Sequence, residues 1–184
     1  HIDCVYDRLF CEEQENGILC GTFDNSLTNS CLLYDMLTDK LDDNVVVAFT
    51  GDEEEGSNGA KEVMRMLRRQ HIQIAFCFVL DVTEEGWKEK CPYTIENDLG
   101  VDMETGYEII RAAKEWGQRY VFVHDAEPDE SWDYDEEDIP CLTLCYPIYG
   151  DMHSNEGCLT RKNSLPIYSE AIARFTKVAT NAVI

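Results

Sequence analysis

The chain has 184 residues, of which 44% are hydrophobic and 28% are charged, so it contains enough apolar material for the core of one domain. Its 37 acidic residues outnumber its 15 lysines and arginines, which gives a formal net charge of −22. This charge argues against nucleic acid or an anionic lipid surface as a partner, because both are bound through clustered basic residues. No apolar run reaches the roughly 18 residues of a membrane span, so we expect no membrane partner.

Short apolar runs typical of strands alternate with segments whose apolar residues recur every three or four positions, as in amphipathic helices. In chain order, we expect a strand at residues 1–6, a helix at 25–41, a strand at 44–50, a helix at 58–69, a strand at 72–80, a less regular segment up to 103, a helix at 104–116, strands at 120–123 and 139–146, and a helix at 166–178. Most of these strands are apolar on both faces. They therefore predict an α/β fold, a three-layer sandwich with a mixed, mainly parallel sheet flanked by helices.

The cysteines indicate a reducing environment. There are nine of them, an odd number, and no two form a CxxC pair. Several lie inside apolar runs, as Cys77 does between Phe76 and Phe78, where a reduced thiol packs like a small hydrophobic side chain. Because disulfides form mainly in oxidising compartments, this usage favours a cytoplasmic location.

Histidines and acids gather where the predicted strands end, and open α/β sheets build their sites at that edge. Strand 44–50 runs into the four acids of residues 52–55, and Asp81 ends the next strand. Asp24 precedes a predicted helix, and His153 follows the last predicted strand. Taken singly, each has a plain structural interpretation, such as a helix cap or a charged turn. Together they supply imidazoles and carboxylates, a donor set suited to zinc.

The first three residues add a second histidine to this set. His1 and Asp3 lie two positions apart in a predicted strand, so their side chains share one face. The carboxylate of Asp3 would then lie behind the imidazole and orient it as a metal ligand.

The order of these motifs resembles that in the catalytic domain of the co-catalytic dizinc exopeptidases. That clan includes zinc aminopeptidases, carboxypeptidase G-type enzymes and acetylornithine deacetylase-type enzymes. Any one of the motifs alone is a weak signal, whereas five in the same order are specific at the level of the clan. The resemblance extends from the first residue to about Phe175, and its motifs are His1-x-Asp3, Gly21-Thr22-Phe23-Asp24-Asn25, Asp52-Glu53-Glu54-Glu55-Gly56, Leu80-Asp81-Val82-Thr83 and Met152-His153-Ser154.

The resemblance implies a site for two zinc ions, and cobalt or manganese can occupy similar ligands. Asp24 would bridge both ions. His1 and Asp81 would complete one metal site, while Glu54 and His153 would complete the other.

The resemblance also implies the roles of the residues beside these ligands. Glu53 would be the general base that takes a proton from a metal-bridging water and returns it to the leaving amine. Asp3 would hold the ring of His1. Because the bridging aspartate of this clan is often followed by a cis peptide bond, we expect one between Asp24 and Asn25.

Spacing helps to choose within the clan. Its dimeric deacylases and carboxypeptidases carry a lid domain between the fourth and fifth motifs, but here residues 82–152 are needed for the sheet and helices. We therefore expect one metallopeptidase-like catalytic domain over residues 1–184, without a lid domain. Clan members usually carry residues before the His-x-Asp motif. Either an upstream segment lies outside this sequence, or the first strand is truncated.

We therefore predict a metal-dependent hydrolase of a peptide or small amide, with a zinc aminopeptidase as the first hypothesis. A dizinc amidohydrolase or deacylase of N-acyl amino acids is the alternative. A non-catalytic metal-binding relative is a third, against which the presence of Glu53 argues. In an aminopeptidase, a carboxylate such as Asp129 or Glu130 would pair with the substrate's α-ammonium group. These two acids fall in residues 127–138, which we interpret as a solvated loop, and His124 is a further candidate at the same edge.

Overall fold

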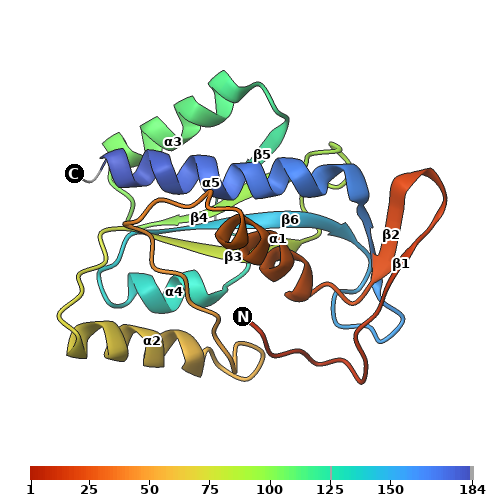
Figure 1. Cartoon of the computed structure of the whole chain (residues 1–184), viewed down its shortest axis with the longest axis horizontal. Coiled ribbons are helices and arrows are strands. Elements are labelled where there is room, and N and C mark those ends of the chain that lie inside the picture. The colour runs from red at the N-terminus through yellow and green to blue at the C-terminus, as the bar shows by residue number, and fades with distance from the viewer. Residues whose placement is uncertain (125, 183–184) are drawn as a thin grey trace.

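A mixed sheet of seven strands lies between two layers of helices in the residues that the structure describes, 1–124 and 126–182 (Figure 1). The structure is a computed structural model. The strands are β1 (Cys11–Glu13), β2 (Ile18–Gly21), β3 (Cys77–Thr83), β4 (Tyr93–Leu99), β5 (Tyr120–Val123), β6 (Cys141–Tyr149) and β7 (Cys158–Arg161).

The helices divide between the two faces of the sheet. The helical elements are α1 (Ser26–Leu37), α2 (Asn58–Arg69), α3 (Met103–Trp116), α4 (Glu130–Asp135) and α5 (Leu165–Ala182), with short 3-10 turns at Glu15–Gly17 and Lys162–Ser164. α1 and α3 pack against α5 on one face, where Tyr93, Tyr168 and Phe175 are fully buried. α2 and α4 cover the other face, where Met64 and Tyr134 pack against Val79 (Figure 1). The expected three-layer α/β architecture is confirmed.

β6 is the central strand. It pairs with β3 in parallel and with β4 antiparallel, and its last two residues pair with β7 antiparallel. β4 and β5 are parallel, while β1–β2 and β2–β7 are antiparallel. The sheet is mixed as predicted, but it contains more antiparallel pairing than expected. The difference arises because β1, β2 and β7 are too short to show a strand pattern. In addition, β4 interleaves buried polar residues with apolar ones.

Two predicted strands, residues 1–6 and 44–50, do not form strands. The backbone N–H of Ile2 donates to the carbonyl of Thr50 at 2.7 Å. This hydrogen bond joins the two segments, but they do not pair as strands. Val46 and Phe49 are exposed. β-branched residues favour a strand only when a neighbouring strand offers hydrogen bonds and packing. Strand propensity alone therefore predicted two strands that do not form.

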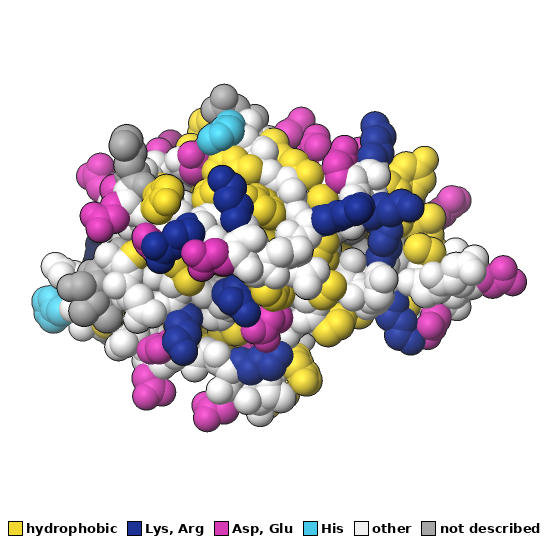
Figure 2. All heavy atoms as spheres, turned by 90° about the horizontal axis from the view of Figure 1, so that it is seen from above, with side chains coloured by type: hydrophobic (Ala, Val, Ile, Leu, Met, Phe, Trp, Pro, Cys, Tyr) yellow, Lys and Arg dark blue, Asp and Glu magenta, His cyan; other side chains and the backbone are white. Residues whose placement is uncertain are grey.

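Charge is unevenly compensated over the surface. Figure 2 shows the face that carries α3 and α5, where basic side chains lie among acidic ones. Ion pairs join Arg111 to Glu108 and Arg174 to Glu170 on these helices.

Among the described residues, none of the helices combines the length and the apolar character needed to cross a bilayer.

A close backbone contact closes the acidic turn of residues 52–55. The N–H of Gly59, in the first turn of α2, donates to the carbonyl of Gly51 at 2.9 Å. A Cβ at Gly59 would lie 2.3 Å from the Gly51 oxygen and 2.4 Å from its nitrogen, which is too close for any side chain. Glycine is therefore required at position 59 for α2 to hold the turn in place.

Replacing Gly59 by alanine tests this contact, with Gly106→Ala in α3 as the matched control. By helix propensity alone, either change would stabilise the fold by about 0.5–1 kcal/mol. A Cβ at Gly106 meets only an ordinary contact, at 3.5 Å from Val101, so Gly106→Ala should raise the free energy of unfolding. Gly59→Ala should lower it by about 1–3 kcal/mol, as overpacking does. Urea unfolding followed by circular dichroism would show this, and stabilisation by both variants would contradict the close contact.

Candidate metal centre

Five chain segments bring their acids and histidines together beside the carboxyl-terminal half of β3. They are the first residues of the chain, the loop that leads into α1, the turn before α2, β3 itself and the loop after β6. Their site side chains are His1, Asp3, Asp24, Glu53, Glu54, Asp81 and His153, which is every residue that the sequence motifs single out.

Asp24 lies at the centre of the group and is only 4% exposed. Its Oδ1 atom lies 3.0 Å from Nε2 of His1, and its Oδ2 atom lies 3.3 Å from Nε2 of His153. Each oxygen of this carboxylate thus faces a different imidazole. The peptide bond between Asp24 and Asn25 is cis, as the resemblance led us to expect.

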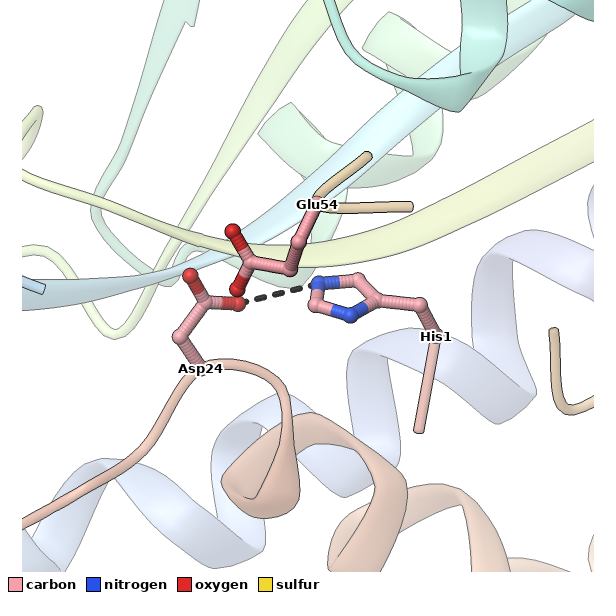
Figure 3. A group of neighbouring side chains, drawn as sticks. All are labelled: His1, Asp24 and Glu54. Atoms are coloured by element: carbon pink, nitrogen blue, oxygen red, sulfur yellow. Dashed lines mark ion pairs between the residues drawn. The ribbon is translucent and has the colours of Figure 1, made fainter. Parts of the chain in front are cut away.

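A further acid lies beside each histidine. Oδ1 of Asp81 is 3.9 Å from Nε2 of His1, and Oε2 of Glu54 is 3.4 Å from Nε2 of His153. Donor atoms of His1, Asp24 and Glu54 all lie within 4.8 Å of one another, and Figure 3 shows these three side chains pointing toward a common centre. The histidines and acids therefore form two groups that share Asp24.

Glu53 and Asp3 flank these groups. Oε2 of Glu53 is 3.9 Å from Nε2 of His1, on the same side of the ring as Asp24 and Asp81. On the other side, Oδ1 of Asp3 lies 3.3 Å from Nδ1 of His1. The second oxygen of Asp3 accepts a hydrogen bond from the backbone N–H of Glu54 at 3.2 Å. Asp3 therefore links the ring of His1 to the acidic turn.

The buried carboxylates carry more negative charge than nearby residues neutralise. Oδ1 of Asp3, Oδ1 of Asp24 and Oε1 of Glu54 are buried and have no hydrogen-bond partner of suitable geometry. Across the described residues, the ion pairs that these acids form are with histidines and not with lysine or arginine. A buried carboxylate without a partner is costly. Imidazole nitrogen with carboxylate oxygen is the donor set of a zinc-like divalent metal, so these residues fit such an ion.

The pKa values of these groups show the same crowding of charge. Burial, together with the neighbouring acids Glu54 and Asp24, raises the pKa of Glu53 to about 7, against the opposing charge of His1. Burial and the charge of Asp24 raise the pKa of Asp81 well above its ordinary value. Burial alone would lower the pKa of His1, but Asp24, Asp81 and Glu53 together raise it to about 10. Without a cation, the site is therefore expected to hold protons at neutral pH.

Tyr6 and Asn25 support the site through contacts that the sequence did not predict. The hydroxyl of Tyr6 accepts from the backbone N–H of Asp24 at 3.2 Å and donates to the carbonyl of Met152, so it joins the central aspartate to the His153 loop. The side chain of Asn25 donates to the carbonyl of Leu80, next to Asp81. These partners lie far apart in the chain, and no local pattern predicts such contacts.

Three further candidates have other partners in the structure. His124 pairs with Asp98 at 3.0 Å, and its side chain is 69% exposed. Asp129 caps α4 by accepting from the N–H of Ser131, and it also accepts from Asn97 and Thr143. Glu130 is buried and accepts from the hydroxyl of Thr50. The interpretation of residues 127–138 as a solvated loop is wrong for α4, because the Asp129 cap starts a helix whose Tyr134 packs into the core.

Comparison with known proteins adds a family to this geometry. The family model described as peptidase family M20/M25/M40 matches residues 1–178. Among curated proteins, none is similar enough in sequence to be matched.

Solved structures of two aminopeptidases and a related peptidase share the fold. An aminopeptidase from the archaeon Desulfurococcus kamchatkensis is 15% identical, with a TM-score of 0.69 over 95% of this chain and 54% of its own. A TET aminopeptidase from a marine sediment archaeon of the Thaumarchaeota is 12% identical, with a TM-score of 0.70 over 94% and 54%. The TET1 peptidase of Pyrococcus horikoshii is 17% identical, with a TM-score of 0.62 over 92% and 53%. This chain thus spans about half the length of these structures, and at such identities the likeness shows the fold alone.

The variant Asp24→Asn tests whether the shared carboxylate holds a metal. This change keeps the size of the side chain but removes the charge that faces both histidines. The affinity for zinc should therefore fall by at least ~10-fold, which is the smallest loss typical of residues that only orient a metal ligand. Zinc retained after dialysis, measured by elemental analysis, gives the readout. Asp43→Asn, at an exposed position, is the charge-matched control. Equal zinc retention by the wild type and both variants would contradict a metal centre at Asp24.

Proposed function

Because the chain belongs to peptidase family M20/M25/M40, we propose that it is a metal-dependent hydrolase that cleaves peptide bonds, specifically an aminopeptidase. The observation that carries this proposal is the buried carboxylate of Asp24, whose two oxygens face His1 and His153 at 3.0 and 3.3 Å, with Glu53 beside the first histidine. The fold is shared with aminopeptidases from Desulfurococcus kamchatkensis and from a Thaumarchaeota archaeon, which supports the choice of an aminopeptidase.

In this proposal the site takes two zinc ions. His1, Asp24 and Asp81 would hold one ion, and Asp24, Glu54 and His153 would hold the other. When bound, such ions act as Lewis acids that polarise the scissile carbonyl and make a water molecule acidic enough to attack at neutral pH.

The protein's own residues would supply the proton transfers. Glu53 takes the proton from the attacking water and passes it to the nitrogen of the leaving amine as the peptide bond breaks. Burial is the main cause that raises the pKa of Glu53 to about 7 in the metal-free site, and the charge of bound metal ions would lower it from there. Asp3 would fix the orientation of His1 through the contact with Nδ1.

A deacylase of N-acyl amino acids is the second candidate, and one observation favours it. The two acids that we expected to bind a substrate's α-ammonium group are occupied elsewhere. Asp129 caps α4, and Glu130 is bound to Thr50. An aminopeptidase therefore needs a different carboxylate for this contact, whereas a deacylase needs none.

Paired substrates with a free and with an acetylated amine distinguish the two candidates. We expect the zinc-loaded protein to cleave an aminoacyl anilide, and we expect acetylation of the substrate amine to reduce kcat/KM strongly, because an amide cannot make the ammonium contact. Release of the aniline measures cleavage of the anilide bond, and release of acetate measures removal of the acetyl group. Preference for acetylated substrates, with release of acetate, would replace the aminopeptidase by the deacylase. No hydrolysis of either class would contradict the proposed function.

The role of Glu53 can be separated from metal binding. Glu53→Gln should lower kcat by roughly 10²- to 10⁴-fold, the usual contribution of a general base, while zinc content stays at the wild-type level. Glu55→Gln, in the same turn but exposed, is the control and should leave both quantities unchanged. If Glu53→Gln lost its zinc together with its activity, Glu53 would be a ligand and not a base.

A further inference from the structure

We propose that Glu130 is a positioning residue for the metal centre and that it acts through Thr50. Glu130 begins α4, and Thr50 precedes the acidic turn, so the two residues are distant in the chain. The hydroxyl of Thr50 donates to Oε2 of Glu130 at 2.9 Å, and both residues are only 5% exposed. No sequence motif assigns a role to either residue.

Thr50 lies at a junction between two segments that carry site residues. Its carbonyl accepts the backbone N–H of Ile2 at 2.7 Å, which fixes the chain directly after His1. Its own chain continues into the turn that holds Glu53 and Glu54. The hydrogen bond from the Thr50 side chain therefore connects α4 to both segments at one point.

The chain before Thr50 supplies little support of its own. Residues 44–49 form no strand, and their side chains are half-buried or exposed. Residues 44–48 line one wall of an apolar cavity of about 480 Å³ that His1, Thr50 and Glu130 also reach. A segment with neither a ladder nor close packing on this side can shift easily. A buried hydrogen bond at its end thus has a large effect on where the following turn lies.

Burial of the Glu130 carboxylate is also unfavourable in free energy, which argues that the residue has a role. Its Oε1 atom is buried without a hydrogen-bond partner, and burial raises the pKa of the group. Its backbone environment does not require an acid, because Asp129 already caps α4. What Glu130 provides is an acceptor for the Thr50 hydroxyl on a helix that is anchored in the core by Tyr134.

Four single variants test this bond with side-chain volume nearly preserved. Thr50→Val and Glu130→Leu remove the donor and the acceptor, whereas Thr50→Ser and Glu130→Gln retain a donor and an acceptor. We expect the first pair to weaken zinc binding by about 10-fold or more, as changes behind metal ligands do, and the second pair to stay close to wild type. The double variant Thr50→Val/Glu130→Leu should be no weaker than the weaker single variant, because both changes break the same bond.

Two readouts keep the positioning role separate from the proposed function. The zinc affinity and the kinetics rest on that function, whereas the hydrogen exchange of the metal-free protein does not. Zinc affinity is measured by competition with a chelator, and hydrogen exchange of residues 50–56 is measured in the metal-free protein, where the first pair should exchange faster. If the enzyme hydrolyses peptides, the first pair should lower kcat more than it changes KM. Urea unfolding identifies any variant that is merely unfolded, and Thr50→Val, the smallest change, then decides the result.

The outcomes separate cleanly. Wild-type zinc affinity and exchange in a folded Thr50→Val would overturn the positioning role, even if peptides are cleaved. Loss of affinity in Glu130→Gln equal to that in Glu130→Leu would overturn it too, since charge and not the hydrogen bond would then matter. The expected affinities in a protein that cleaves no peptide would leave the positioning role standing and contradict the proposed function.

Discussion

The buried carboxylate of Asp24 is the group on which the site depends. It lies between two imidazoles, with further acids beside each of them, and the ion pairs it forms among the described residues are with histidine alone. Removing such a carboxylate from water is unfavourable unless positive charge or hydrogen bonds compensate it. Burial first, and the neighbouring acids second, raise the pKa values of Glu53 and Asp81. A divalent cation at this point would satisfy the orphaned oxygens and stabilise the arrangement.

The fold holds this arrangement through backbone contacts outside the cluster itself. Tyr6 holds the N–H of Asp24, and Asp3 joins His1 to the N–H of Glu54. The contact of Gly59 with Gly51 closes the acidic turn against α2. Each contact crosses between segments that are separated in sequence, and each places one side of the cluster. The candidate metal centre is therefore a product of tertiary packing, although its residues come from short local motifs.

The sequence was informative about the site and less so about the elements around it. Short motifs in a specific order singled out Asp24, Glu54 and His153, and the fold brings these side chains together. β4 was missed because Glu96 and Asn97 are buried polar residues in a strand, where a sequence pattern expects apolar ones. The expectation of a strand at residues 44–50 was wrong, because β-propensity says nothing about whether a partner strand is present. The hydrogen bond between Glu130 and Thr50 could not be predicted for the same reason, since it joins segments that are distant in the chain.

A crystal structure of the zinc-soaked protein, with anomalous data collected at the zinc edge, tests the central claim most directly. The account predicts two anomalous peaks, one on each side of the Asp24 carboxylate. The first should lie against His1 and Asp81, and the second against His153 and Glu54, with Glu53 near both but bound to neither. Zinc bound only elsewhere on the protein, or an Asp24 carboxylate that contacts protein groups alone at saturating zinc, would contradict the account.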